Sequence, residues 1–150
     1  MDDIDRKILA ELQRDGRQTL TELARKVRLS NSPCHRRLRE LEASGAISGY
    51  HAKLNAAALG LAFEALVFVT MRYEDRETVA AFEAAVEQVP NVVSAQRLFG
   101  DPDYLLRIVA RDQSAYQMLY DEQIAALPGI QRLTSTLVMK NVVDARPLPL

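Results

Sequence analysis

The amino-acid sequence predicts an α+β protein with two domains: a three-helix (winged) helix-turn-helix domain, then a ferredoxin-like domain with the order βαββαβ. Two observations support this prediction. Residues 3–44 carry apolar side chains at helical spacing in three short segments, whereas the later chain switches repeatedly between strand-like and helical patterns. We expect the helix-turn-helix domain at residues 1–50, a hinge at 51–60 and the second domain at 61–150.

Residues 19–44 justify the helix-turn-helix prediction. Thr19 and Glu22 have the spacing of a capping box, which marks a helix start. A turn follows, and Ser30 or Ser32 can cap the next helix, with Pro33 in its first turn. The helix predicted near the N-terminus, which Gly16 would end, would cover the back of this pair.

The third predicted helix concentrates positive charge at His35-Arg36-Arg37-x-Arg39. A helix pair whose second member has a cationic outer face is typical of proteins that place this helix in the DNA major groove. The alternative is a structural helix pair with a solvated charged face. Arg37 in particular could be structural and reach Glu40 or Glu42. The expected DNA-binding residues are Thr19, Ser30, Asn31, Ser32, His35, Arg36, Arg37 and Arg39.

Charge and composition restrict the other possibilities. The formal net charge is −1, but residues 1–50 carry ten Lys or Arg against eight Asp or Glu, and residues 51–150 carry nine against twelve. This distribution suits a protein that meets phosphate at one end only. A single cysteine excludes an internal disulfide. Without a signal peptide or a long apolar run, we expect a soluble, cytoplasmic protein that does not enter membranes.

The second domain is expected to alternate strands and helices. Predicted strands cover 63–73, 92–99, 104–110 and 130–143, and predicted helices are capped by Thr78 and Asp112. A further strand-like stretch, 47–54, could form a wing. Two helices would cover one face of the sheet and leave the other bare. Because apolar residues such as Leu66, Val67, Phe68 and Val69 would lie on both faces of the sheet, the bare face would be a large exposed apolar patch, and we predict a homodimer at least.

Several spaced motifs resemble the leucine-responsive regulatory protein/asparagine regulator (Lrp/AsnC) family of bacterial and archaeal transcription factors. The front half matches through Leu29-Ser30-x-x-Pro33-Cys34-x-x-Arg37-Leu38, and the rear half through Gly100-Asp101-x-Asp103-Tyr104 and Leu127-Pro128-Gly129-Ile130. The resemblance covers nearly the whole chain. Two departures are Asn31, where many members have proline, and Pro102 in the acidic turn.

The resemblance implies double-stranded DNA as a partner, an amino acid as the small effector, and dimers that assemble into octamers or other higher oligomers. From the residues alone, the turn at 100–104 is either an ordinary hairpin loop or a site whose carboxylates bind an α-ammonium group. The resemblance favours the site. The residues implied in effector binding are Gly100, Asp101, Asp103 and Tyr104, with Thr134, Thr136 and Leu137 as weaker candidates.

No motif for catalysis, a metal or a cofactor is visible in the sequence. We therefore expect a transcriptional regulator and not an enzyme. Two alternatives remain: an architectural DNA-binding protein without an effector, and a tetrapyrrole-modifying enzyme on the same fold. The second alternative is disfavoured because no histidine follows His51.

Overall fold

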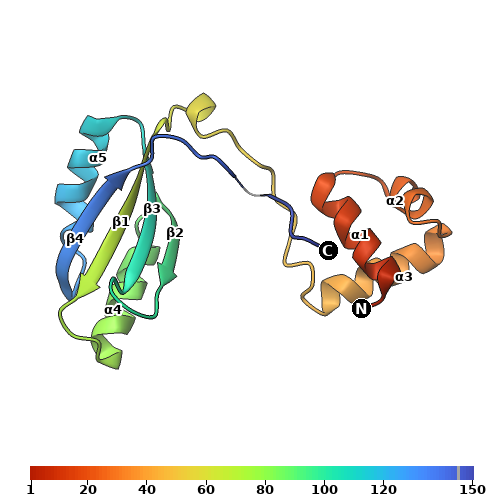
Figure 1. Ribbon diagram of the computed structural model, residues 1–150, viewed down its shortest axis with the longest axis horizontal. Helices are drawn as coiled ribbons and strands as arrows, with labels where there is room; N and C mark the ends of the chain where they lie inside the picture. The colour runs from red at the N-terminus through yellow and green to blue at the C-terminus, as the bar shows by residue number, and fades with distance from the viewer. Residues whose placement is uncertain (145) are drawn as a thin grey trace. The chain divides into compact units, whose positions relative to one another are not determined.

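The computed structural model describes residues 1–144 and 146–150, which divide into two compact units. The first unit contains Met1–Lys53 together with Val142–Leu150, and the second contains Leu54–Asn141. The C-terminal segment thus belongs to the first unit, although the sequence suggested a second domain that continues to residue 150. Figure 1 shows a bundle of helices in the first unit and a sheet with helices in the second.

The first unit is a bundle of three helices, α1 (Asp3–Arg14), α2 (Leu20–Lys26) and α3 (Asn31–Ala43). Their starts follow the capping signals of the sequence. Asp2 caps α1, and the predicted capping box of Thr19 and Glu22 is confirmed at the start of α2. Ser30 is the N-cap residue of α3 but makes no side-chain capping bond. The helices enclose a small core: Ile8, Leu9, Leu23, Ala24, Val27, Cys34 and Leu41.

The second unit has the predicted order βαββαβ. Its elements are β1 (Phe63–Met71), α4 (Arg76–Glu87), β2 (Val92–Arg97), β3 (Tyr104–Ala110), α5 (Gln113–Leu119) and β4 (Ile130–Leu137). A 3₁₀ turn at Ala57–Leu59 precedes β1, and a π-helical turn at Tyr120–Ile124 continues α5. All strand pairs are antiparallel, in the order β2-β3-β1-β4.

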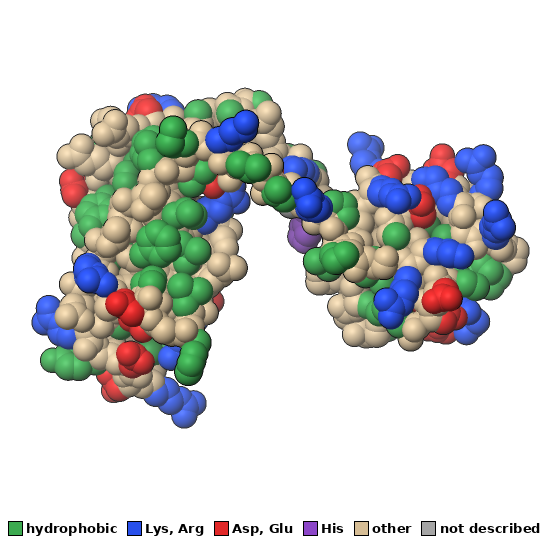
Figure 2. All heavy atoms as spheres, viewed as in Figure 1, with side chains coloured by type: hydrophobic (Ala, Val, Ile, Leu, Met, Phe, Trp, Pro, Cys, Tyr) green, Lys and Arg blue, Asp and Glu red, His purple; other side chains and the backbone are tan. Residues whose placement is uncertain are grey.

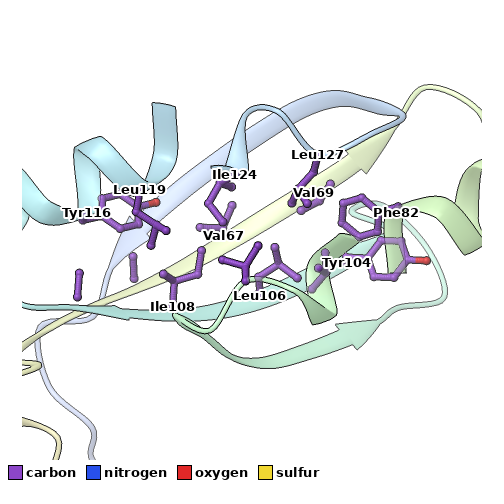
Figure 3. Close-up of a cluster of buried hydrophobic side chains, with 14 of the residues drawn as sticks. Val67, Val69, Phe82, Tyr104, Leu106, Ile108, Tyr116, Leu119, Ile124 and Leu127 are labelled. Carbon is purple, nitrogen blue, oxygen red and sulfur yellow. The ribbon is translucent and has the colours of Figure 1, made fainter. Parts of the chain in front are cut away.

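The alternation of burial along β1 from Ala65 onward defines the two faces of this sheet. Ala65, Val67 and Val69 are fully buried, whereas Leu66 and Phe68, which alternate with them, are half-buried. Figure 3 shows the inner face of the sheet and the helices meeting in one apolar cluster. The side chains labelled there are Val67, Val69, Phe82, Tyr104, Leu106, Ile108, Tyr116, Leu119, Ile124 and Leu127.

The outer face of the sheet has no covering helix among the described residues. Leu66 and Phe68 of β1 lie on it, opposite Thr136 and Thr134 of β4 in the antiparallel register. Figure 2 shows hydrophobic side chains gathered over the strands of the second unit. The sequence-based expectation of a half-bare apolar sheet agrees with this geometry.

Several details of the sequence prediction are wrong. The strands predicted at 63–73 and 92–99 each end two residues earlier, at Met71 and Arg97. Ile47–Leu54 forms no strand, because no strand in the described chain pairs with it. The last strand ends at Leu137, and one more backbone bond, from Val138 to Glu64, completes its pairing with β1. The N-cap of α4 is Asp75, and Thr78 lies inside the helix. The single helix predicted after Asp112 is instead α5 followed by the π-helical turn.

Candidate DNA-binding surface and effector site

Helix α3 presents the predicted cationic residues in different environments. His35, Arg36 and Arg39 are exposed, whereas Arg37 is half-buried. Arg36 forms an ion pair of 2.9 Å with Glu40, one turn further along the same helix. Within the described part of the chain, Arg39 makes no ion pair with a carboxylate. The exposed face of α3 therefore offers one free guanidinium and one in a solvent-exposed pair, which water and salt weaken.

Arg37 points back to the start of α1. Its guanidinium lies 2.7 Å from Asp2 Oδ2 and 2.8 Å from Asp5 Oδ1. The hydrogen bonds that the guanidinium donates to these two carboxylates, that to Asp5 first, raise the pKa of Arg37. A structural role for this arginine was one of the two expectations, but its partners are on α1 and are neither Glu40 nor Glu42.

The residues around the N-terminus of α3 are exposed, and some of their polar atoms form hydrogen bonds within the protein. Asn31 Nδ2 donates to the hydroxyl of Thr21 at 3.2 Å, which joins α3 to α2. The hydroxyl of Thr19 accepts from Glu22 N and donates to the Glu22 carboxylate, so it serves the capping box. Ser30 and Ser32 are exposed, and no side-chain bond of theirs is recorded among the described residues.

The turn between α2 and α3 contains a residue that the sequence analysis did not select. Arg28 has a φ of 59°, a left-handed conformation that is uncommon for a residue with a side chain. Its side chain is exposed. A guanidinium next to the α3 start could reach a DNA backbone, and only its place in the turn would have suggested this from sequence.

In the second unit, the acidic turn between β2 and β3 borders an open hollow of about 960 Å³. Three of the seven predicted effector residues line it: Gly100, Asp101 and Asp103. The peptide bond between Asp101 and Pro102 is cis. The hollow is also lined by residues that the sequence analysis did not select, namely Thr70, Met71, Arg72, Glu74, Arg97, Leu98, Phe99 and Gln131.

The two carboxylates of the turn differ in how they are held. Asp103 Oδ2 accepts a 2.6 Å hydrogen bond from the backbone N–H of Met71, at the irregular end of β1. Asp101 is exposed; its carboxylate accepts from the Thr70 hydroxyl at 3.2 Å and faces the Arg132 guanidinium at 3.4 Å. Asp103 is thus fixed to the sheet, whereas Asp101 is free to exchange partners.

The other four predicted effector residues do not join this hollow, and they divide between the two sheet faces. Tyr104 is buried on the helix side, where its hydroxyl donates to Glu83 at 2.7 Å. Burial, followed by the nearby Glu83 carboxylate, raises the pKa of Tyr104 to about 12. Leu137 pairs with Ala65 on the same side, whereas Thr134 and Thr136 lie on the outer face.

Among the described residues, no group of three or more His, Cys, Asp or Glu side chains has the geometry of a metal site. No helix in that part of the chain is long and apolar enough to cross a membrane. Cys34 is fully buried in the first core, and burial raises the pKa of its thiol, as expected for a packing residue.

Comparisons with known proteins agree on both units. Residues 1–48 match the family model for winged helix-turn-helix DNA-binding domains, and residues 64–148 match the Lrp/AsnC ligand binding domain. The leucine-responsive regulatory protein of Rhizobium meliloti is 39% identical over 97% of this chain and 93% of its own. The Bkd operon transcriptional regulator of Pseudomonas aeruginosa is 37% identical over 100% and 98%.

A solved structure extends this similarity to three dimensions. The crystal structure of a transcriptional regulator of Neisseria meningitidis in complex with L-Met has a TM-score of 0.93 to this chain. The two sequences are 35% identical, and the alignment covers 99% of this chain and 96% of the other.

Proposed function

The chain belongs to the Lrp/AsnC family of transcriptional regulators, and from this premise we propose that α3 binds double-stranded DNA while the hollow beside the acidic turn binds a free amino acid. The exposed cationic face of α3, with α1 packed behind it, is the observation that supports the DNA-binding assignment. The first unit would read an operator, and the second would sense the effector and assemble the oligomer.

At the DNA interface, Arg39 and Arg36 supply the positive charge. Arg39 can bind a phosphate or a guanine edge without first leaving a partner. Arg36 would exchange its exposed pair with Glu40 for a phosphate. Ser30, Asn31 and Ser32 lie where a helix N-terminus meets the DNA backbone, and His35 completes this face. A mobility-shift titration of operator DNA with the Arg36→Ala/Arg39→Ala variant tests the assignment, and unchanged affinity would refute it.

Asp101, which lines the hollow, and Arg132, which faces Asp101 at 3.4 Å, match the two charges of a free amino acid. The α-ammonium would bind Asp101, and the displaced Arg132 guanidinium could then pair with the α-carboxylate. At Gly100 the backbone is accessible from the hollow, because an added Cβ would meet no atom within 4 Å; its φ of +131° favours glycine. The Neisseria protein that was solved with L-Met supports an amino acid as the class of ligand.

Calorimetry with each of the twenty amino acids tests this site. Binding heat that disappears in Asp101→Asn supports the sensor. No heat with any of the twenty would favour the alternative of an architectural DNA-binding protein without an effector. Because the relatives are named as regulators of transcription, a tetrapyrrole-modifying activity has no support, and we infer a non-enzymatic role in the cytoplasm.

The outer face of the sheet is the proposed dimer interface, since Leu66 and Phe68 would otherwise remain on an apolar surface. Dimers would then assemble into higher oligomers, with an octamer as the expected form. An amino acid could change DNA binding only by binding one assembly more tightly than another. Light scattering of Phe68→Asp tests the interface, with loss of the dimer as the expected result.

A further inference from the structure

The segment Pro147-Leu148-Pro149-Leu150 has few backbone N–H donors. Proline has no N–H, so Leu148 carries the only backbone donor between Pro147 and Pro149. A residue before proline is also restricted to extended conformations. The segment therefore loses little conformational freedom when it binds in an extended form, and it can be recognised through one N–H group.

The side-chain amide of Gln13, in the last turns of α1, binds both backbone groups of Leu148. The N–H of Leu148 donates to Gln13 Oε1 at 2.6 Å, and Gln13 Nε2 donates to the Leu148 carbonyl at 3.2 Å. These partners are separated by 135 residues of sequence. A two-point clamp of this kind reads the direction and register of an extended peptide, because an amide group matches one N–H and one C=O.

A groove on the first unit surrounds this clamp. It has a volume of about 360 Å³, and its apolar walls come from the start of the chain, from α1 and from the segment after α3. The side chains that form these walls are Met1, Leu9, Leu12, Ile47 and Tyr50, and the tail contributes Leu148 and Leu150. The Leu148 side chain is 71% exposed, so the clamp on its backbone is the specific part of the contact.

A second contact involves Asp144, which precedes residues 146–150 in the C-terminal part of the first unit. The Lys53 ammonium lies 3.0 Å from the Asp144 carboxylate and also donates to the Asp144 carbonyl at 3.3 Å. This pair is exposed and contributes little by itself. Asp144 and Leu148 are thus two separate points at which the C-terminal part of the first unit contacts its N-terminal part.

We propose that this groove of the DNA-reading unit is a docking site for the chain's own C-terminal tail, residues 146–150, and that Gln13 recognises the tail through the backbone of Leu148. Docking makes the C-terminal end of the chain a part of the DNA-reading unit, although it follows the second unit in sequence. The proposal does not depend on the identity of the effector or of the operator.

Hydrogen–deuterium exchange of the full-length protein tests the proposal. In a peptic fragment that ends at Leu150, the last five residues contain backbone N–H groups only at positions 146, 148 and 150. We expect one of these amides, that of Leu148, to exchange at least roughly ten times more slowly than in the denatured chain. Gln13→Ala should abolish this protection, whereas Gln117→Ala, at an exposed glutamine of α5, should preserve it.

Two substitutions at one position separate the backbone from the side chain. Leu148→Ala keeps the N–H and should keep the protected amide. Leu148→Pro removes the N–H, and the tail should then be released, seen as faster removal of Leu150 by a carboxypeptidase. Equal digestion of both variants, or wild-type protection that survives Gln13→Ala, would overturn the proposal.

A cross-link identifies which copy of the chain supplies the tail. Oxidation of Gln13→Cys/Leu148→Cys should give an internal disulfide and a fast-migrating monomer on a non-reducing gel, and each single variant serves as a control. A covalent dimer would show that the groove takes the tail of a second copy, which would overturn the assignment to the chain's own tail.

Discussion

The guanidinium of Arg37 lies 2.8 Å from a carboxylate oxygen of Asp5, a residue that precedes it by 32 positions. Asp2 and Asp5 also form the capping box of α1. One oxygen of each carboxylate accepts from the backbone, from two N–H groups at Asp2 and one at Asp5, and the other oxygen accepts from Arg37. The start of α1 and the middle of α3 are thus joined by one guanidinium. This arrangement favours a positioning role for Arg37 over direct contact with DNA.

Arg37→Ala and Asp5→Asn should therefore behave alike. Both should lower the thermal unfolding midpoint and weaken operator binding, because both loosen α3 on α1. Neither should change the slope of log K against log salt, since no phosphate contact is lost. Mobility-shift titrations at several salt concentrations measure this. A slope that decreases by about 1 in Arg37→Ala alone would instead assign that arginine to a phosphate.

Arg36→Ala/Arg39→Ala should show the opposite pattern. The unfolding midpoint should stay within a few degrees of the wild type, because Arg36 has only an exposed partner and Arg39 has no carboxylate partner in the described chain. Operator affinity should fall roughly tenfold or more, and the salt slope should decrease by about 2, one for each lost phosphate contact. Glu87→Ala/Glu122→Ala, two exposed charges of the second unit, is a control with the same number of charges removed.

Acid should weaken the first unit through the caps of its helices. Hydrogen bonds from backbone N–H groups lower the pKa of Asp2 and of Glu22 in the folded state. A carboxyl group with a depressed pKa stabilises the fold above its unfolded pKa, and this contribution is lost as the pH falls through the folded value. The unfolding midpoint should thus decrease below about pH 4.

Circular dichroism melts between pH 7 and pH 2.5 measure this loss. Asp2→Asn should be less stable than the wild type at pH 7 and should lose less on acidification. If the unfolding midpoints of the two proteins fell in parallel with pH, Asp2 would make no contribution to the acid sensitivity of the fold.

Substitutions of the two carboxylates of the acidic turn should have different effects, one on stability and the other on ligand binding. Asp103→Ala leaves the backbone N–H of Met71 without its partner, and this should destabilise the second unit by about 1–3 kcal/mol. Asp101→Ala removes only exposed contacts and should leave the melting curve nearly unchanged while amino-acid binding is lost. Chemical denaturation and calorimetry of both variants distinguish these effects. Equal destabilisation by the two substitutions would contradict the division.

Gly129 should tolerate no side chain. Its φ is +74°, and a Cβ there would overlap Thr78 and lie 2.9 Å from the Met71 methyl group. Gly129→Ala should therefore cost about 2–4 kcal/mol of unfolding free energy. Gly60→Ala is the matched control, because Gly60 has a φ of +78° with nothing within 4 Å, and it should cost only about 1–2 kcal/mol. Similar losses in urea titrations would exclude the close contact as the cause.

Features of the fold that depend on neighbouring residues were predictable from the sequence. The capping box of Thr19 and Glu22 spans four residues, and its geometry follows from that spacing alone. The strand β3 and the cap of α5 by Asp112 were also located correctly. At Ile47–Leu54 the alternating pattern was misleading, because a strand needs a partner and the sequence does not show whether one exists.

The predicted sites were less complete because their contacts join distant segments. Arg37 was expected to contact DNA or a carboxylate of its own helix, but its partners lie 32 and 35 residues away. Tyr104 follows the acidic turn directly in sequence. Because side chains alternate along a strand, its ring nevertheless lies on the helix-covered face of the sheet and not in the hollow. Arg132 was overlooked since only the pairing of β1 with β4 brings it near Asp101.

The sensing unit is, in topological terms, an insertion within the DNA-reading unit. The chain leaves the first unit beside Lys53 and returns to it beside Asp144, and these two residues touch. Within the second unit, the entering and departing segments also lie together, since Val138 donates its backbone N–H to the Glu64 carbonyl. A shortened gene that joins residue 53 to residue 142 through a few glycines should thus encode the DNA-binding unit alone. This protein should be monomeric, should bind no amino acid and should retain residues 142–150.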